Sequence, residues 1–432
     1  MDSEKYSRVL ILSHNSLSKN QSNGKTIYSM LKNIPKENIA QVFLSTDIPD
    51  FEICNYYFEM NDFDVIRKML YRNEYAKQVK VDDINNKILI KKKEKSSKTL
   101  QIVRNIKGPL FNIFRDSIWM IAGYREKKLI DFIKKFKPNV LFFHSSGNVF
   151  SFKIAEWISR KYNLKIILET TDDYLGYRPT INPFFYVLNY MLNKEYKIIA
   201  KKASLIIVIS DEMKKKYIKK YPCEYYIAMN SVEIKMMVNK VGLEKKIKIL
   251  YSGNIELNRW KTILLLSKVI EKIDYVDIEL NIYTLTNISK YIKSKFKKYS
   301  KTGFRNAVNS EQLAGIRQDS DILLHVESFD MKNKYITRYS ISTKISEYLA
   351  SGKAILAIGP DSIASIKYLK REGVAEVVTH PNEKEIKKAL SRLFSREYRD
   401  ILAQKGFTLA KEKHNIEKVA CDIEAAIKSA IS

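Results

Sequence analysis

Short apolar runs alternate with longer amphipathic segments over the first half of the chain. In the longer segments apolar residues recur every three or four positions, which predicts helices, whereas the short runs are typical of buried strands. We predict strands at residues 9–13, 41–45, 140–144, 166–169 and 205–210, and helices at residues 25–33, 62–73, 112–135, 152–162 and 183–201. This alternation indicates a parallel α/β sheet.

A second series of the same kind begins at residue 247. Its predicted strands are residues 247–253, 278–283, 322–326, 354–358 and 376–378, and a last helix covers residues 415–429. The two series predict two doubly wound α/β domains, residues 1–235 and 236–432, with the seam at residues 232–246. Ligands of such sheets bind at the carboxyl ends of the strands, so we expect the functional residues in the loops that follow them.

The composition agrees with two folded domains. Of 432 residues, 45% are hydrophobic and 29% are charged, which is typical of a globular protein. The three cysteines are scattered, which disfavours a zinc site or a disulfide framework and favours a reducing compartment. The apolar runs are too short for a signal peptide or a membrane span, so we expect a cytoplasmic protein.

The net charge of +28 narrows the choice of partners. Nucleic acid, an anionic membrane and phosphate-bearing substrates would all attract such a chain. Lys, Ile, Asn and Tyr are abundant, as an AT-rich genome would produce, and no nucleic-acid-binding motif accompanies the charge. We therefore rank compositional drift and attraction to a membrane surface ahead of nucleic acid.

Two segments of the first domain carry much of this charge. The Lys-rich residues 80–107 are predicted to form an exposed loop or hairpin. Residues 112–135 combine aromatic side chains with Arg and Lys, which fits a basic helix docked on a membrane. An aromatic-rich core helix is the alternative, and we place it slightly ahead.

The segment 340–360, SISTKISEYLASGKAILAIGP, has the pattern of a capped helix followed by a buried strand. The free N–H groups at a helix start attract phosphate, which makes Ser342, Thr343 and Lys344 candidate ligands. Glu347 lies one turn deeper and could accept hydrogen bonds from sugar hydroxyls, as acidic residues do with ribose. The alternative is an ordinary capped helix on which Glu347 is merely solvated.

A second segment, YSGNIELNRWKT (residues 251–262), has a strand that ends at Gly253 and a loop with two cations. Arg259 and Lys261 would clamp a diphosphate and stabilise the charge on a departing nucleotide. Two solvated cations are the alternative in so basic a chain, and the pairing with residues 340–360 favours the functional interpretation.

EYLASGKAILAIGP, at residues 347–360, resembles the donor-binding segment of GT-B glycosyltransferases, particularly the GT4-like group. The loop with Arg259 and Lys261 resembles the one that contacts the donor diphosphate in that group. The resemblance implies two Rossmann-like domains facing a cleft, with the C-terminal helix crossing back to the first domain. It also implies Glu347 as the ligand of the nucleoside ribose.

The same resemblance implies transfer of a sugar from a nucleoside diphosphate donor, mostly with retention and without an evident protein nucleophile. The acceptor implied by the resemblance is a saccharide, lipid-linked in the group's usual setting, which is the synthesis of capsule, exopolysaccharide or lipopolysaccharide at the inner membrane face. One departure concerns the donor sugar. Related transferases often carry a second glutamate eight residues before the one at Glu347, whereas this chain has Tyr339 there and its nearest upstream acid is Glu327.

The loop after the first strand contains a GKT triplet that invites comparison with a phosphate-binding P-loop. That motif needs a glycine five residues before Gly24, where this chain has Lys19, so we exclude an NTPase. We interpret Gly24 as opening a turn into a helix on the acceptor side, with Lys25 either touching phosphate or solvated.

Other candidate residues follow predicted strands. Asp172 and Asp173 come after residues 166–169 and suit a general base or acceptor ligands, with a loop-capping pair as an equal alternative. His144 and His325 end strands in the two domains, and a structural role is the more common one for such histidines. Of these, we select Asp173, Asp172 and His144 as the catalytic candidates.

The triplet Asp319-Ser320-Asp321 spells the metal motif of the other major glycosyltransferase fold. Here it precedes a strand, so we interpret it as a helix-to-strand turn and predict neither a bound metal nor a cofactor. Two rival functions remain open. A nucleotide-sugar epimerase of the same fold would need more catalytic acids and histidines, and a non-catalytic binder of nucleic acid or anionic surfaces would need no donor site.

Overall fold

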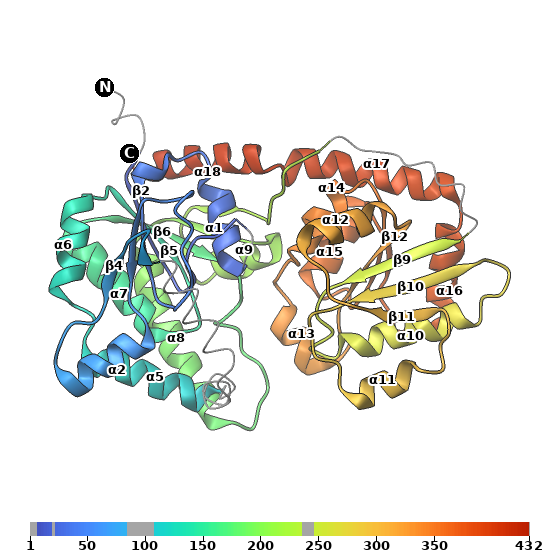
Figure 1. The fold of residues 1–432 in the computed structure, drawn as a ribbon, viewed down its shortest axis with the longest axis horizontal. Helices are drawn as coiled ribbons and strands as arrows, with labels where there is room; N and C mark the ends of the chain where they lie inside the picture. The colour runs from blue at the N-terminus through green and yellow to red at the C-terminus, as the bar shows by residue number, and fades with distance from the viewer. Residues whose placement is uncertain (1–6, 20–21, 84–107, 236–245, 432) are drawn as a thin grey trace. The chain divides into compact units, whose positions relative to one another are not determined.

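Each half of the chain folds around a parallel or mostly parallel sheet covered by helices (Figure 1). The computed structural model describes residues 7–19, 22–83, 108–235 and 246–431. The chain divides into two units, the first made of residues 1–228 and 419–432 and the second of residues 229–418. No helix in the described ranges is long and apolar enough to cross a membrane.

The first unit has an eight-stranded sheet in the order β4-β3-β2-β1-β5-β6-β7-β8, in which only β4 is antiparallel to its neighbour. Its strands are β1 (Val9–Ser13), β2 (Ile39–Phe43), β3 (Tyr56–Glu59), β4 (Lys77–Val79), β5 (Val140–His144), β6 (Lys165–Thr170), β7 (Ala203–Val208) and β8 (Tyr225–Ile227). Its helices are α1 (Ser22–Leu31), α2 (Asp62–Tyr71), α5 (Pro109–Ala122), α6 (Lys127–Phe136), α7 (Val149–Tyr162), α8 (Pro183–Lys202), α9 (Asp211–Ile218) and α18 (Ile416–Ile431), with a 3₁₀ turn η1 (Lys36–Asn38).

The second unit has a six-stranded, fully parallel sheet in the order β11-β10-β9-β12-β13-β14. Its strands are β9 (Ile247–Ser252), β10 (Ile278–Tyr283), β11 (Thr302–Arg305), β12 (Ile322–Val326), β13 (Ala354–Ile358) and β14 (Glu376–Val378). Its helices are α10 (Arg259–Glu271), α11 (Lys290–Phe296), α12 (Ser310–Gln318), α13 (Met331–Thr337), α14 (Lys344–Ala350), α15 (Ala364–Glu372), α16 (Glu383–Leu393) and α17 (Arg396–Lys413).

The last helix returns to the first unit. Val419, Ile423 and Ile427 of α18 are buried in the same core as strand β1 and helix α1. Apolar residues at this spacing lie on one face of a helix, which explains why α18 can cover the sheet. The predicted fold class, with two doubly wound domains and a C-terminal helix that crosses back, is confirmed.

Both sheets reverse their strand order at one point. In the first unit the chain places β2 and β3 on one side of β1, and β5 to β8 on the other. In the second unit β10 and β11 lie on one side of β9, and β12 to β14 on the other. Ligands of open α/β sheets bind at such switch points, so the ends of β1 with β5, and of β9 with β12, are the places to search for a site.

The predicted helix over residues 112–135 is wrong in its extent. The structure has two helices there, because α5 ends at Gly123, whose φ of 74° is unfavourable for other residues. The short strands β3, β4, β8 and β11 were not predicted. The Lys-rich residues 84–107 and most of the predicted seam, residues 236–245, lie outside the described residues.

The triplet 319–321 lies in the turn between α12 and β12, as predicted. Asp319 is the residue after the last turn of α12, and the carboxylate of Asp321 accepts a hydrogen bond from the Lys248 amide at 2.9 Å. The triplet therefore has a structural role at the amino end of β12. Among the residues that the structure describes, no group of three or more His, Cys, Asp or Glu could hold a metal ion.

Candidate functional site

A cavity opens at the switch point of the second unit. Strands β9 and β12 pair only at Ile249 with Ile322 and at Leu250 with Leu323. Beyond these pairs the carboxyl ends of both strands line a cavity of about 270 Å³, together with the start of α10, residues 340–343 and the first residue of α14, Lys344. The site therefore lies where the topology of a doubly wound sheet favours a ligand.

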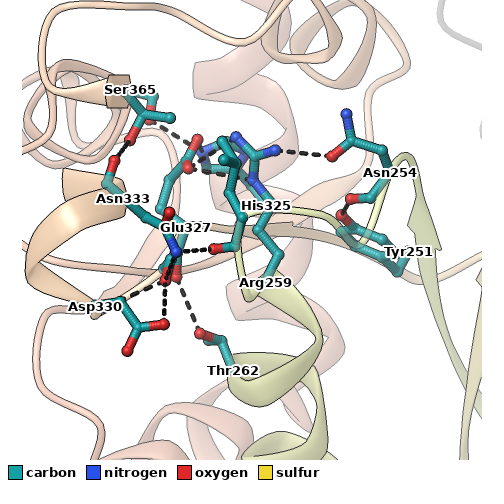
Figure 2. Close-up of polar contacts among 12 residues, drawn as sticks. Tyr251, Asn254, Arg259, Thr262, His325, Glu327, Asp330, Asn333 and Ser365 are labelled. Atoms are coloured by element: carbon teal, nitrogen blue, oxygen red, sulfur yellow. Dashed lines mark hydrogen bonds and ion pairs between the residues drawn. The ribbon is translucent and has the colours of Figure 1, made fainter. Parts of the chain in front are cut away.

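Arg259 and Glu327 form an ion pair on the wall of this cavity (Figure 2). The Arg259 Nη2 and Nε atoms lie 3.0 and 3.3 Å from one Glu327 carboxylate oxygen, and Nη1 donates to Asn254 at 2.8 Å. Burial raises the pKa of Glu327, although Arg259 and Lys344 oppose the shift. The guanidinium is thus fixed from two sides before any ligand arrives.

Lys344 is the second cation on the wall. Burial and the charge of Arg259 lower its pKa to about 8, while Glu327 and Glu347 favour the charged form. Its ammonium group has no hydrogen-bond or ion-pair partner among the described residues, although the carboxylates of Glu327 and Glu347 attract it through space. The Tyr251 ring lies 5.8 Å from Nζ. A partly buried cation without a direct partner is ready to bind an anion.

Gly253 leaves the room that Lys344 needs. A Cβ atom at position 253 would collide with the ammonium group of Lys344, and the backbone there has a φ of 154°. The loop after β9 and the start of α14 are therefore matched to each other. Sequence analysis placed both residues in the donor site, and the structure brings them into contact.

His325 lines the same cavity as the two cations. It is buried at the end of β12, and its Nε2 is 3.1 Å from the Ser365 hydroxyl (Figure 2). Burial, with Arg259 and Lys344 nearby, lowers its pKa to about 3. The imidazole is therefore neutral at physiological pH and adds no charge to the cavity.

The other predicted donor residues occupy different positions. Ser342 and Thr343 line the cavity, and Thr343 is the residue before α14 but its side chain makes no capping hydrogen bond. Glu347 does not line the cavity, and its carboxylate accepts a hydrogen bond from Arg317 of α12 at 2.8 Å. Lys261 is half-exposed and lies 3.4 Å from Asp330, also away from the lining.

The switch point of the first unit carries a separate polar cluster. His144 ends β5 and forms a buried ion pair with Glu169 of β6. Burial lowers the pKa of His144, but the carboxylates of Glu169 and Asp172 outweigh it and raise the pKa. The second ring nitrogen of His144 is buried without a hydrogen-bond partner in the described structure.

The predicted acids of this unit differ from each other. Asp173 is held by Lys216 at 2.6 Å and by the Tyr217 hydroxyl at 2.8 Å, with its side chain buried. Asp172 is exposed, with the Tyr174 hydroxyl 3.3 Å from its carboxylate. These contacts hold Asp173 in a hydrogen-bond network with a structural role, whereas Asp172 is accessible to solvent.

Gly24 lies in the first turn of α1, against the backbone carbonyl of Ser16, so that no larger residue fits there. Lys25 follows it and is partly exposed. The glycine therefore sets the path of the loop that follows β1, as the sequence interpretation of a tight entry into the helix requires.

Sequence analysis missed three residues of the polar cluster in the first unit, namely His14, Arg115 and Asp62. His14 follows β1, and burial together with Arg115 lowers its pKa to about 4, so the ring is neutral. Arg115 of α5 donates to Asp62 at 2.8 Å, at the start of α2. The place of His14, directly after the central strand, was the one signal that could have identified it.

No protein-family model and no curated protein sequence matches the chain. Solved structures do match over its whole length. A glycosyltransferase from Rickettsia africae aligns with a TM-score of 0.60 and 12% identity over 99% of both chains. HepE of Anabaena, in complex with UDP-glucose, aligns with a TM-score of 0.60 and 9% identity over 98% of this chain and 99% of its own.

The lipopolysaccharide outer core galactosyltransferase WaaB aligns with a TM-score of 0.56 and 13% identity, over 98% of this chain and 99% of its own. At sequence identities this low, the structural matches establish a shared fold and nothing more. The two Rossmann-like units and the order of their elements are those of the GT-B fold.

Proposed function

We propose that this chain of the GT-B fold is a glycosyltransferase that moves a sugar from a nucleoside diphosphate donor to an acceptor hydroxyl. One observation carries the proposal. Lys344, a partly buried cation without a direct ion-pair partner in the described structure, shares a cavity with Arg259 at the switch point of the second unit. Glu327 balances the charge of Arg259, and a diphosphate would supply negative charge for Lys344.

In the proposed complex the donor diphosphate binds Arg259 and Lys344, next to the backbone of Ser342 and Thr343. Both cations are fixed in a poorly solvated site, where charge stabilises a departing phosphate more than it does in water. They supply the positive charge that a metal supplies in other transferases, so we propose that neither a metal nor another cofactor is needed.

Glu347 is proposed to hold the ribose of the nucleotide. Its pairing with Arg317 orients the carboxylate from α12, and a carboxylate has enough lone pairs to accept a further hydrogen bond from a sugar hydroxyl. Lys261 is proposed to reach the outer phosphate, since a half-exposed lysine in a single ion pair with Asp330 can change partners at small cost.

The acceptor is proposed to bind the first unit, at the cluster of His14, His144 and Asp172. Two neutral or unpaired ring nitrogens and an exposed carboxylate suit hydroxyl groups of a saccharide. Asp172 is accessible for the role of base, whereas Asp173 would have to leave two partners. Glu327, the carboxylate on the donor cavity, is held by Arg259 and is a poor nucleophile, which agrees with retention without a covalent intermediate.

The pathway is proposed from the chemistry of the structural neighbours. One of them holds UDP-glucose and another is named for the lipopolysaccharide outer core. We propose the synthesis of a cell-surface polysaccharide, such as capsule or lipopolysaccharide, with a lipid-linked acceptor at the cytoplasmic face of the membrane.

The experiment is to incubate the protein with UDP-, GDP-, ADP- and CMP-linked sugars and measure release of the free nucleotide. We expect slow release with one donor class and an increase with added saccharide acceptor. Arg259→Ala should lower this rate, while the matched control Lys272→Met, which removes an exposed lysine from the end of the same helix, should leave it unchanged. The proposal would be contradicted if none of the four donor classes released nucleotide, or if the two variants released it at equal rates.

A further inference from the structure

Large apolar side chains are exposed on three helices of the first unit, α2, α5 and α8, whose ribbons are labelled in Figure 1. Helix α5 packs against both α2 and α8, so the three helices are neighbours. The exposed apolar residues on them are Phe63, Ile66, Met69, Leu70, Tyr71, Leu110, Phe114, Met120, Ile121, Phe184, Tyr186, Val187 and Tyr190. We call this surface the α2–α5–α8 face.

Helix α5 shows the pattern most clearly. Leu110, Phe114, Ser117 and Ile121 follow at intervals of four, three and four residues, so they form one outward stripe. Phe114 is 61% exposed and Ile121 is 76% exposed. The opposite face of the same helix already carries the buried residue Trp119, which means that the outward stripe is not needed for the core.

The charged residues exposed on this face are basic, apart from Asp62 of α2, whose side chain is 44% exposed and pairs with Arg115. On α2 the fully exposed charged residue is Arg67, and on α8 the exposed charged residues are Lys194, Lys197, Lys201 and Lys202. The acids of α5 and α8, Asp116 and Glu195, are both buried. On α8 the exposed side chains change from apolar in the first half to lysine in the second.

We propose that the α2–α5–α8 face docks on the surface of an anionic phospholipid bilayer. The apolar side chains would enter the interfacial layer while the lysines and arginine contact lipid phosphates, the combination by which interfacial helices bind anionic membranes. A second copy of the chain is a poorer occupant, because a symmetric contact would bring lysines of like charge together.

The face also lies close to the polar cluster of the same unit. The inner side of α5 supplies Arg115 and Trp119, which both donate to Asp62 at the start of α2. If the proposed function holds, a lipid-linked acceptor in the bilayer would thus be presented next to His14. Only this last step rests on the proposed function, since docking itself needs neither donor nor acceptor.

Co-flotation with vesicles, without nucleotide, tests the proposal. The wild type should float with vesicles of phosphatidylcholine and phosphatidylglycerol in equal parts, much less with phosphatidylcholine alone, and less as salt is raised. Phe114→Ser with Ile121→Ser should lower the vesicle partition coefficient by about tenfold or more. The matched control, Leu285→Ser with Ile401→Ser, removes two exposed aliphatic side chains of the second unit and should bind as the wild type does.

A second variant acts on the charge alone. Lys194→Gln, Lys197→Gln and Lys201→Gln together should weaken binding by about tenfold or more and flatten its salt dependence. Three results would overturn the proposal. The first is no flotation of the wild type, and the second is an equal loss of vesicle binding in the control variant. The third is a wild-type dimer in solution that does not bind vesicles and that Phe114→Ser with Ile121→Ser dissociates. Nucleotide binding by the same samples shows separately whether the donor site is intact.

Discussion

The ammonium group of Lys344 occupies the space that a side chain at Gly253 would need, so the position that this lysine takes at the start of α14 requires glycine 91 residues earlier in the chain. Lys344 and Arg259 line the same cavity, so a side chain at position 253 that displaces Lys344 would move one of the two cations of the proposed diphosphate site.

Gly253→Ala should therefore displace Lys344. We expect at least about tenfold weaker binding of nucleoside diphosphate and a lower melting temperature, because the new methyl group collides with Lys344 on a backbone unfavourable for alanine. Calorimetric titration and thermal unfolding measure the two effects.

The matched control is Gly315→Ala in α12. Nothing lies near a Cβ atom at that position, and alanine in a helix is favoured over glycine by about 0.5–1 kcal/mol. This variant should be as stable as the wild type or more stable, with unchanged nucleotide affinity. Equal behaviour of the two alanine variants would show that the contact at position 253 has no role.

Affinity for nucleoside diphosphate should fall as the pH rises through about 8, the pKa to which burial and Arg259 lower Lys344. Below that pH the free protein carries the charged form, and above it binding must first return a proton to Lys344. Because one proton is linked to binding, the affinity falls by at most about tenfold per pH unit, and it stops falling roughly where the pH reaches the pKa of Lys344 in the complex. Titrations across this range measure it.

Lys344→Arg is the control, because its guanidinium stays charged throughout. It should remove the pH dependence whatever its effect on affinity at neutral pH. An identical pH profile in both proteins would assign the titration to another group.

Glu347→Ala should weaken the binding of nucleoside diphosphate by about tenfold and leave the binding of inorganic pyrophosphate unchanged, since the carboxylate is assigned to the ribose and not to phosphate. Competition of both ligands for the same site measures this difference. If the affinity for pyrophosphate falls as much as the affinity for the nucleotide, Glu347 acts through the charge of the cavity and not through the ribose.

The second unit was predicted well and the first less so. Strands 278–283, 322–326, 354–358 and 376–378 match the structure end to end, because apolar residues recur within each, alternately or in a run, and a polar or turn residue follows its end. In the first unit, residues 112–135 have one continuous apolar pattern, and only the backbone conformation of Gly123 divides it into two helices. Strand β3 has no such clear boundaries and was missed.

The site was predicted in its residue types but not in its contacts. Arg259, Lys344 and Gly253 stand in recognisable segments, whereas the partner of Arg259 is 68 residues away, beyond the end of another strand. Neither the partial burial of Lys344 nor its lack of a direct ion-pair partner among the described residues can be derived from a linear pattern, since both depend on how α10, α14 and β12 pack together.

The His144–Glu169 pair should make the stability of the first unit depend on pH. The raised pKa of His144 means that the charged pair stabilises the fold fully below about pH 6.5, the ordinary value, and that this contribution is lost as the pH rises through the folded value. We expect the free energy of unfolding to decrease with rising pH in that window. Denaturant titrations at several pH values measure it.

Glu169→Gln removes the charge that raises this pKa, so the variant should be less stable than the wild type at low pH and the two should converge at higher pH. A constant difference between the two proteins over the whole range would contradict the assignment, because it would mean that the pair contributes packing and hydrogen bonding but no charge.

The central claim is that Lys344 is retained for a ligand, and calorimetric titration of UDP and GDP into the wild type and Lys344→Met tests it most directly. Methionine keeps the apolar part of the side chain and removes a costly buried charge, so the variant should unfold at the same temperature or higher. We predict that the wild type binds one of the two nucleotides and that Lys344→Met loses at least about 100-fold in affinity. Unchanged affinity in Lys344→Met, or no binding of either nucleotide to the wild type, would contradict the account.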